Sequence, residues 1–137
     1  MPFVPSATHT PYEALGGEPA VRVLVEHFYD AMSTLEPPLA ALHPCDADGR
    51  VSRGSRDRFA LFFIGWLGGP QAYVAQFGHP RLGMRHARVP IDTSMSEAWM
   101  RCMRHAFDEC GVTGDIRGYL DARLGEVAAF LRNRERA

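Results

Sequence analysis

The stretch between Gly68 and His86 constrains the fold of this chain most, because it interrupts helical structure twice within a few residues. Gly68-Gly69-Pro70 ends one apolar segment, and Gly78-His79-Pro80 ends the short segment that follows it. Glycine is costly to fix in a helix and proline lacks the backbone N–H, so neither continues a regular helix. The stretch then leads to His86, a residue that in isolation would be read as a surface or capped histidine.

Segments with apolar residues at helical spacing lie on both sides of this stretch. In three of them apolar residues recur every three or four positions, which is the pattern of a helix with one buried face. The remaining segment, residues 59–67, is so rich in large apolar side chains that we expect it to be buried on most sides. A strand of that length fits the same residues, but the Gly-Gly-Pro stop and the helical neighbours favour a helix. Together they predict an all-α domain, with long helices over residues 19–36, 59–67, 94–110 and 115–131.

Local motifs predict where the helices begin and end. Thr10-Pro11-Tyr12-Glu13 is a capping box with proline at the first helical position, and Gly16-Gly17 stops the short helix that it starts. Ser94-Met95-Ser96-Glu97 is read as a second capping box. The remaining expectations are a single turn over residues 39–43, a loop over 44–53 with Ser52 or Ser55 as the next cap, and a short helix over 70–77.

The length and charge of the chain exclude several classes of protein. A chain of 137 residues is expected to form one domain, here residues 11–137, preceded by a flexible arm over residues 1–10. A formal charge of -1 gives no field that would gather nucleic acid or an anionic membrane. No apolar run reaches the ~20 residues of a membrane span, and the N-terminal residues lack the pattern of a secretory signal.

The three cysteines do not form a disulfide framework. Cys102 and Cys110 are eight positions apart in a helical segment, which separates their Cα atoms by ~12 Å and exceeds the ~7 Å reach of a disulfide. Neither these two residues nor Cys45 have the spacing of a zinc site. We therefore expect reduced core thiols and a cytoplasmic protein.

Several short motifs, taken together, resemble the group II truncated haemoglobins over roughly residues 11–131. The resemblance implies an all-α truncated globin, a sandwich of two helices over two that encloses haem b (iron protoporphyrin IX). Glycine pairs stand where full globins have longer helices. The motifs that carry the resemblance are Gly16-Gly17, Phe28-Tyr29, Gly68-Gly69, Gly78-His79-Pro80-Arg81-Leu82, Met84-Arg85-His86, Ala98-Trp99 and Cys102-Met103.

The resemblance assigns the central roles to three residues. His86 would be the proximal ligand of the haem iron and therefore the metal ligand. Tyr29 corresponds to the distal tyrosine, and its phenol would donate a hydrogen bond to a bound ligand. Trp99 corresponds to the distal tryptophan, whose indole N–H is a donor only. Without the resemblance, Tyr29 is read as a core tyrosine bonded to a backbone carbonyl, and Trp99 as a packing residue.

The resemblance places further residues around the cofactor. His43 falls where the family packs an aromatic residue or a histidine, so it would be a titratable distal donor or even a sixth iron ligand; the alternative is an exposed turn histidine. Ser55 falls where full globins have their distal histidine and would leave a small, open gate. Phe59 would be a wall of the pocket. The other apolar members of the expected cofactor-binding set are Phe63 and Leu82.

A polar group of residues matches positions that the family uses near the haem propionates. A guanidinium can pair with a carboxylate through two parallel hydrogen bonds, which suits the arginines of this group. The alternative for each member is a solvated surface residue. The group consists of Arg58, Tyr73, His79 and Arg85.

The sequence departs from the family pattern at two places near His86. Gly83 stands where an arginine is common, and Arg88-Val89 stands where Pro-Phe is usual. Glycine costs more entropy to fix, so the first departure is expected to loosen the segment that carries His86. The second is expected to change the packing below the haem.

The expected function is binding of O2 and other diatomic ligands, such as CO or NO, by a monomer or weak homodimer. Hydrogen bonds from Tyr29, Trp99 and His43 would slow oxygen release, which suits sensing, scavenging or redox work better than bulk oxygen transport. An enzymatic alternative is peroxidase-like or nitric-oxide dioxygenase activity supported by an unidentified reductase. A third reading is a cofactor-free helical interaction module, in which these residues are only core.

Overall fold

The computed structural model describes residues 2–82, 86, 89 and 91–132, and this part of the chain is helical, without any strand. Two isolated bridges, Ser6 with His9 and Cys45 with Val51, are its only β-type pairings. The longer helices are α2 (Gly17–Leu35), α4 (Arg53–Trp66), α7 (Thr93–Glu109) and α8 (Gly114–Phe130). The shorter helices are α1 (Pro11–Leu15), α3 (Pro37–Ala40) and α5 (Ala72–Phe77).

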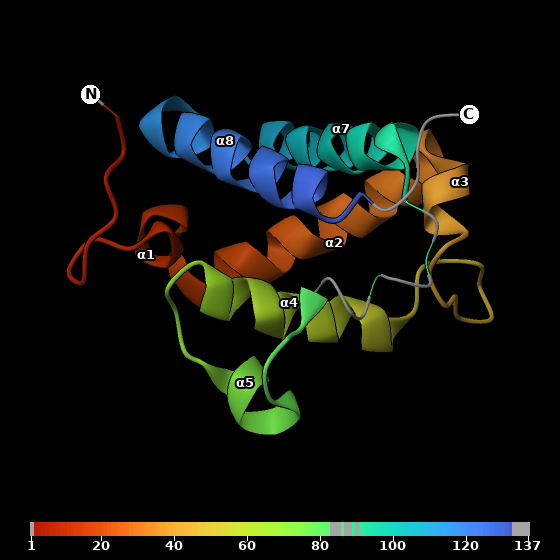
Figure 1. The fold of residues 1–137 in the computed structure, drawn as a ribbon, viewed down its shortest axis with the longest axis horizontal. Helices are drawn as coiled ribbons and strands as arrows, with labels where there is room; N and C mark the ends of the chain where they lie inside the picture. The colour runs from red at the N-terminus through yellow and green to blue at the C-terminus, as the bar shows by residue number, and fades with distance from the viewer. Residues whose placement is uncertain (1, 83–85, 87–88, 90, 133–137) are drawn as a thin grey trace.

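The four longer helices pack as two layers of two. Figure 1 shows α7 and α8 side by side, with α2 crossing beneath them and α4 below α2. Helix α2 packs against both α7 and α4, so it joins the two layers. The predicted all-α sandwich of two helices over two is confirmed by this arrangement.

The start of the domain follows the predicted capping pattern, with one correction. The Thr10 hydroxyl accepts the Glu13 N–H at 3.1 Å, which confirms the first capping box. The prediction that α2 opens at Pro19 is wrong, because α2 already begins at Gly17. Gly16 and Gly17 make the turn with φ values of 110° and 80°, left-handed conformations that favour glycine. Pro19 fits in the first turn of α2, because backbone N–H groups in a first turn have no acceptor within the helix and the missing N–H of proline therefore costs no hydrogen bond.

Two other helix starts differ from the sequence reading. Helix α3 begins at Pro37, whereas a turn over residues 39–43 was expected, because proline suits the first helical position. Helix α7 is capped by Asp92, whose carboxylate accepts the Met95 N–H at 2.9 Å, so the capping box at residues 94–97 is wrong. The Ser96 hydroxyl instead donates to the Ala128 carbonyl at 3.1 Å and ties α7 to α8.

Helix α4 is longer and less completely buried than its sequence suggested. Of the two predicted caps, Ser52 is the one used: its hydroxyl accepts the Ser55 N–H at 3.1 Å, and the helix begins at Arg53. Phe63 and Ile64 are buried as expected, but Phe59 is only half-buried. The prediction of burial on most sides is therefore wrong for the face that carries Phe59.

The remaining local predictions are partly confirmed. Cys102 is a fully buried free thiol, but Cys45 is exposed, so the expectation of core thiols is wrong for it. Phe3 packs against His9 and Tyr119 at ring-centroid distances of 4.7 and 5.2 Å; flexibility of the arm stays a prediction. In the described ranges, none of the helices has the length and hydropathy that a membrane crossing requires.

The Gly68-Gly69 break is needed because the chain comes into close contact with α1 there. The Tyr12 N–H donates to the Leu67 carbonyl at 2.9 Å, which ties the start of α1 to the end of α4. A Cβ atom added to Gly69 would lie 2.6 Å from Cδ1 of the Tyr12 ring. Gly68 has a φ of 97°, so the two glycines serve different needs at the same turn.

We predict that Gly69→Ala lowers the free energy of unfolding by about 1–3 kcal/mol, because the added methyl overlaps the Tyr12 ring and forces it to shift. Gly125→Ala in α8 is the matched control: no heavy atom lies within 4 Å of its added Cβ. That control is expected to stabilise the protein by about 0.5–1 kcal/mol, since alanine is the better helix former. Urea unfolding measures both, and a neutral Gly69→Ala would contradict the close-approach explanation.

Candidate functional site

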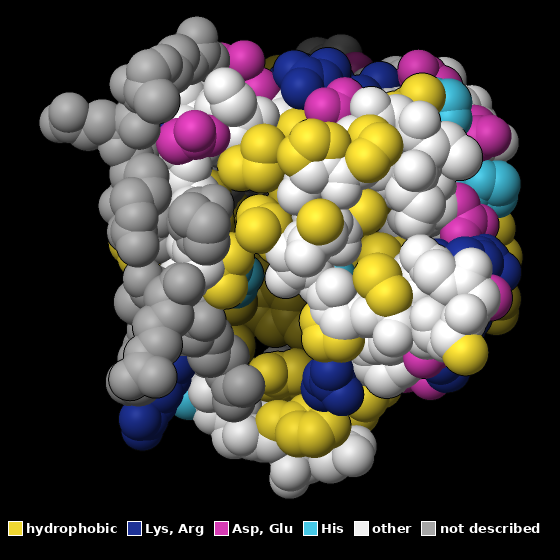
Figure 2. Space-filling model, turned by 90° about the vertical axis from the view of Figure 1, so that its right-hand side faces the viewer, with side chains coloured by type: hydrophobic (Ala, Val, Ile, Leu, Met, Phe, Trp, Pro, Cys, Tyr) yellow, Lys and Arg dark blue, Asp and Glu magenta, His cyan; other side chains and the backbone are white. Residues whose placement is uncertain are grey.

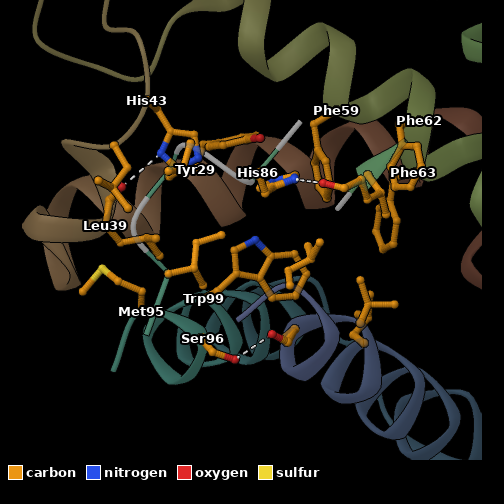
Figure 3. Close-up of a pocket in the computed structure, with 18 of the residues that line it drawn as sticks. Tyr29, Leu39, His43, Phe59, Phe62, Phe63, His86, Met95, Ser96 and Trp99 are labelled. Atoms are coloured by element: carbon orange, nitrogen blue, oxygen red, sulfur yellow. Dashed lines mark hydrogen bonds between the residues drawn. The ribbon is translucent and has the colours of Figure 1, made fainter. Parts of the chain in front are cut away.

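A cavity of about 470 Å³ lies between the helical layers and opens at the surface. Figure 2 shows a hollow with hydrophobic side chains on its walls, and Figure 3 shows the side chains that line the cavity. The volume lies in the range of small-molecule and cofactor sites. It brings together most of the residues that the sequence analysis had assigned to a cofactor: Tyr29, His43, Arg58, Phe59, Phe63, Tyr73, Leu82, His86 and Trp99.

His86 lies at the cavity wall, and one of its two ring nitrogens is hydrogen-bonded to the backbone. Its Nδ1 atom lies 2.7 Å from the Leu82 carbonyl oxygen, as the dashed line in Figure 3 shows. A carbonyl only accepts, so Nδ1 must donate. In the neutral ring this bond places the lone pair on Nε2, the form in which a histidine ligates a metal.

Tyr29 lies on α2 where the core meets the cavity. Its side chain is 5% exposed, and its ring is 5.0 Å from the Phe28 ring. Burial raises the pKa of the Tyr29 phenol, although the positive charges of Arg56 and Arg58 oppose this rise. The hydroxyl therefore keeps its proton at neutral pH and is a hydrogen-bond donor at the cavity.

Trp99 comes from α7 and faces the same space. Its ring centroid is 5.0 Å from that of Phe28 and 6.5 Å from that of Phe59, both in edge-on geometry. Figure 3 shows the indole nitrogen directed toward the region below Tyr29 and His86. Trp99 thus packs on the core and also presents an N–H donor to the cavity, so the two roles predicted for it are compatible.

His43 follows α3 and is half-buried at the cavity, so it is not the exposed turn histidine of the alternative reading. Its Nδ1 atom donates to the Leu39 carbonyl at 3.0 Å, and its ring lies 5.7 Å from the Tyr29 ring. Burial lowers the pKa of His43 below its ordinary value. At neutral pH the imidazole is therefore uncharged, with a lone pair rather than a proton on Nε2.

The aromatic face of α4 forms one wall of the cavity. Phe59 stacks on Phe63 at 5.3 Å, and Phe63 stacks on Trp66 at 5.8 Å. Phe62 meets the Tyr73 ring of α5 at 5.7 Å. The sequence analysis did not assign Phe62 or Trp66 to the site. Their spacing of three and seven positions from Phe59 was the available signal, because such residues share a helix face.

Other lining residues come from helix faces, a turn and loops that the sequence analysis did not assign to the site. Helix α8 contributes apolar side chains at helical spacing, and the start of α7 adds Met95 and Ser96. The 3.6-residue period identifies a buried face but does not tell whether that face meets another helix or a cavity. The missed lining residues outside α4 are Leu39, Leu42, Pro44, Val89, Ile91, Met95, Ser96, Leu124, Val127, Ala128 and Leu131.

The predicted polar residues around the cofactor are only partly brought together. Arg58 and Tyr73 line the cavity. His79 is exposed and does not line it; its Nδ1 accepts the Arg81 N–H at 3.0 Å. Ser55 lies in the first turn of α4, bonded to the Ser52 hydroxyl at 3.0 Å, and is also not among the lining residues. Arg85 lies outside the described residues, as do the sequence departures at Gly83 and Arg88.

The donor set determines what the cavity can hold. No group of three histidine, cysteine or acidic side chains in the described part of the chain could hold a bare metal ion. The walls are mainly apolar and aromatic, with two imidazoles, His43 and His86, each oriented by a backbone carbonyl, and an exposed guanidinium at Arg58. These residues fit a flat apolar cofactor that brings its own metal, needs one axial ligand and carries carboxylates, which is the chemistry of haem.

The comparisons with known proteins agree with this chemistry. A profile of the bacterial-like globin family matches residues 10–131. The group 2 truncated hemoglobin YjbI of Bacillus subtilis is 34% identical over 129 residues, 94% of this chain and 92% of that protein. The crystal structure of the group II truncated hemoglobin from Bacillus anthracis has a TM-score of 0.85 and 35% identity, covering 93% of this chain and 98% of its own.

A further solved structure is described by its ligand. The truncated oxygen-avid haemoglobin from Bacillus subtilis has a TM-score of 0.81 and 35% identity, covering 90% of this chain and 99% of its own. The family match covers most of the chain, and the likeness extends from sequence to fold. The chain therefore belongs to the bacterial-like globins, within them to the group II truncated haemoglobins, and a haem-binding, ligand-binding function goes with that membership.

Proposed function

We propose that this protein binds haem b in the cavity, with His86 as the axial ligand, and that it binds O2 and other diatomic ligands there. The observation that carries the proposal is the 2.7 Å bond from His86 Nδ1 to the Leu82 carbonyl at the wall of an aromatic cavity. The similarity to a haemoglobin described as oxygen-avid supports oxygen as the ligand.

Haem, when bound, would supply an iron that binds small gases reversibly. The residues of this chain do the rest. With Nδ1 engaged by the Leu82 carbonyl, His86 would present Nε2 to the iron, and the aromatic side chains of α4 would shield the bound ligand from water. The Arg58 guanidinium at the cavity would pair with a haem carboxylate.

Two side chains are proposed to donate hydrogen bonds to the ligand. The Tyr29 hydroxyl and the Trp99 indole N–H both belong to residues that line the cavity, and they come from different helices. A gas molecule that gains negative charge on binding is stabilised by such donors. The expected consequence is slow release, which suits a sensor, a scavenger or a redox role.

The proximal side supports ligand binding over rapid peroxide turnover. Peroxidase-type sites strengthen the proximal imidazole with a carboxylate acceptor. Here the Leu82 carbonyl accepts the His86 Nδ1 proton. A neutral carbonyl draws the proton less strongly than a carboxylate, so it leaves the imidazole a weaker electron donor.

We predict that His86→Ala abolishes the haem absorption of the purified protein, because the cavity then loses the imidazole proposed as the axial ligand. The Soret band should shift on reduction and again with carbon monoxide in the wild-type protein. His105→Ala is the control, since His105 lies on α7 and does not line the cavity. An unaltered spectrum in His86→Ala would refute the ligand assignment.

Replacement of Tyr29 or Trp99 by phenylalanine is predicted to raise the O2 dissociation rate by about 5–30-fold, for a lost hydrogen bond of about 1–2 kcal/mol. Stopped-flow displacement of O2 by carbon monoxide measures this rate. Tyr119→Phe is the control, because Tyr119 packs against Phe3 and is not a lining residue. Unchanged rates in both cavity variants would contradict the proposed donors.

The uncharged form of His43 predicts a specific pH dependence of ligand release. Its Nδ1 proton is used by the Leu39 carbonyl, so Nε2 can donate only after protonation. Burial lowers the pKa of His43 below 6.5, so protonation occurs on the acid side of that value. Among the described residues, the other ionisable groups around the same cavity are Tyr29, Arg58, Tyr73 and His86.

Acidification from pH 7.5 to below 6.5 should therefore slow O2 release progressively, by about 5-fold once His43 is protonated, for a gained hydrogen bond of about 1 kcal/mol. The same stopped-flow assay across this pH range gives the profile. His43→Phe should remove the dependence and leave the neutral-pH rate nearly unchanged. A profile that persists in His43→Phe would assign the titration to another group.

A further inference from the structure

A buried arginine lies behind Tyr29, and the sequence analysis had no indication of it. Arg56 belongs to α4 and is 2% exposed, although arginine is among the residues least often buried. It does not line the cavity. The centre of its guanidinium lies 5.8 Å from the centroid of the Tyr29 ring, within the range of a cation–π contact.

The guanidinium of Arg56 is fixed by four acceptor atoms, one of which is the Glu26 carbonyl oxygen at 3.4 Å from Nη1. Nε donates to the Val51 carbonyl at 2.8 Å. Nη1 lies 2.9 Å from the Glu26 carboxylate and 3.0 Å from the Asp30 carboxylate. Both carboxylates are on α2, three positions before and one position after Tyr29. Val51, Glu26 and Asp30 thus form a clamp around the guanidinium of Arg56. The clamp holds this cation against the segment of α2 that carries Tyr29.

One nitrogen of the same group is not used by the clamp. Nη2 of Arg56 is buried and has no hydrogen-bond partner among the described residues. A buried guanidinium N–H without an acceptor is costly, so its position needs a reason. The Tyr29 ring is the π-system within cation–π range of this guanidinium. An electron-rich ring face compensates part of that cost.

The neighbouring arginines do not share this environment. Arg53 pairs with Glu26 and Arg50 pairs with Asp30, but their side chains are 57% and 54% exposed. Solvent screens the charges of these two, whereas the charge of Arg56 acts through protein. Arg56 is also the first positive charge among those that oppose the burial-induced rise in the Tyr29 pKa.

We infer that Arg56 is a positioning residue that sets how strongly Tyr29 donates a hydrogen bond to a ligand in the cavity. A cation over the ring draws electron density from the phenol and makes its O–H a stronger donor. The carboxylates of Glu26 and Asp30 partly offset this effect, because they neutralise the cation. The inference rests on the proposed function, since it requires a ligand that Tyr29 contacts.

Two substitutions are predicted to change the strength of hydrogen-bond donation by Tyr29 in opposite directions. Arg56→Met removes the cation and should weaken donation by Tyr29. Asp30→Asn removes one of the anions that face Arg56 and should strengthen it. A general loosening of the α2–α4 packing would move both variants the same way, so the pair of signs separates an electrostatic role from a structural one.

The experiment uses the haem-loaded protein with carbon monoxide, whose stretching band falls in wavenumber as the positive potential beside it rises. Arg56→Met should move the band to higher wavenumber, by part of the shift that Tyr29→Phe produces. It should also speed O2 release by about 2–5-fold, as expected for loss of one cation–π contact. Asp30→Asn should move the band to lower wavenumber and slow release. Arg53→Met, which also loses a partner of Glu26, should leave both unchanged.

The outcomes distinguish a failure of the role inferred for Arg56 from a failure of the proposed ligand-binding function. If Tyr29→Phe shifts the band but Arg56→Met does not, the role of Arg56 is overturned. Shifts of the same sign in Arg56→Met and Asp30→Asn overturn it as well. If Tyr29→Phe itself leaves the band in place, the proposed distal role of Tyr29 fails and the inference fails with it. Should Arg56→Met not fold, Arg56→Lys and Asp30→Asn carry the test: the lysine must retain the wild-type band more closely than Tyr29→Phe does.

Discussion

Helix α2 is the element on which the rest of this structure depends, because it packs against α4 in one layer and α7 in the other. Val21, Phe28 and Met32 on this helix are fully buried, so its rotation about its own axis is fixed by the core. Tyr29 follows Phe28 and is thereby directed to the cavity. Core packing and the placement of the proposed distal donor are consequences of the same helix register.

The two histidines of the cavity are oriented by the same local device. His43 and His86 each donate Nδ1 to the carbonyl four residues earlier, Leu39 and Leu82 respectively. Backbone geometry alone therefore selects the form in which Nε2 carries the lone pair. For His86 this is the form that the proposed ligation of iron requires. For His43 it means that the neutral ring accepts rather than donates, so charge decides whether it contributes a hydrogen bond.

Sequence reasoning was most successful where the information is local. The Gly68-Gly69 break and the Thr10 cap depend on conformational preferences within a few residues, and both are confirmed. It failed where one residue depends on a distant partner. The burial of Arg56 requires Glu26, which is 30 positions away, and no periodic pattern of apolar residues places a charge in a core. The cavity-lining residues of α8 were not predicted for a related reason. The sequence pattern of an apolar helix face is the same whether that face packs against another helix or against a cofactor.

The clamp behind Tyr29 contains arginine as its only cation, and this fixes its response to acid and base. Arginine keeps its charge at any pH a folded protein meets, so alkali leaves the clamp intact. Arg53 and Arg56 hold the pKa of Glu26 below its ordinary value despite partial burial, and Arg50 and Arg56 do the same for Asp30. Lowered carboxyl pKa values contribute stability above about pH 4.5 that is lost as the pH falls through them. The stability that the clamp gives to the α2–α4 packing is therefore independent of pH from weakly acid to strongly alkaline conditions and is lost only in strong acid.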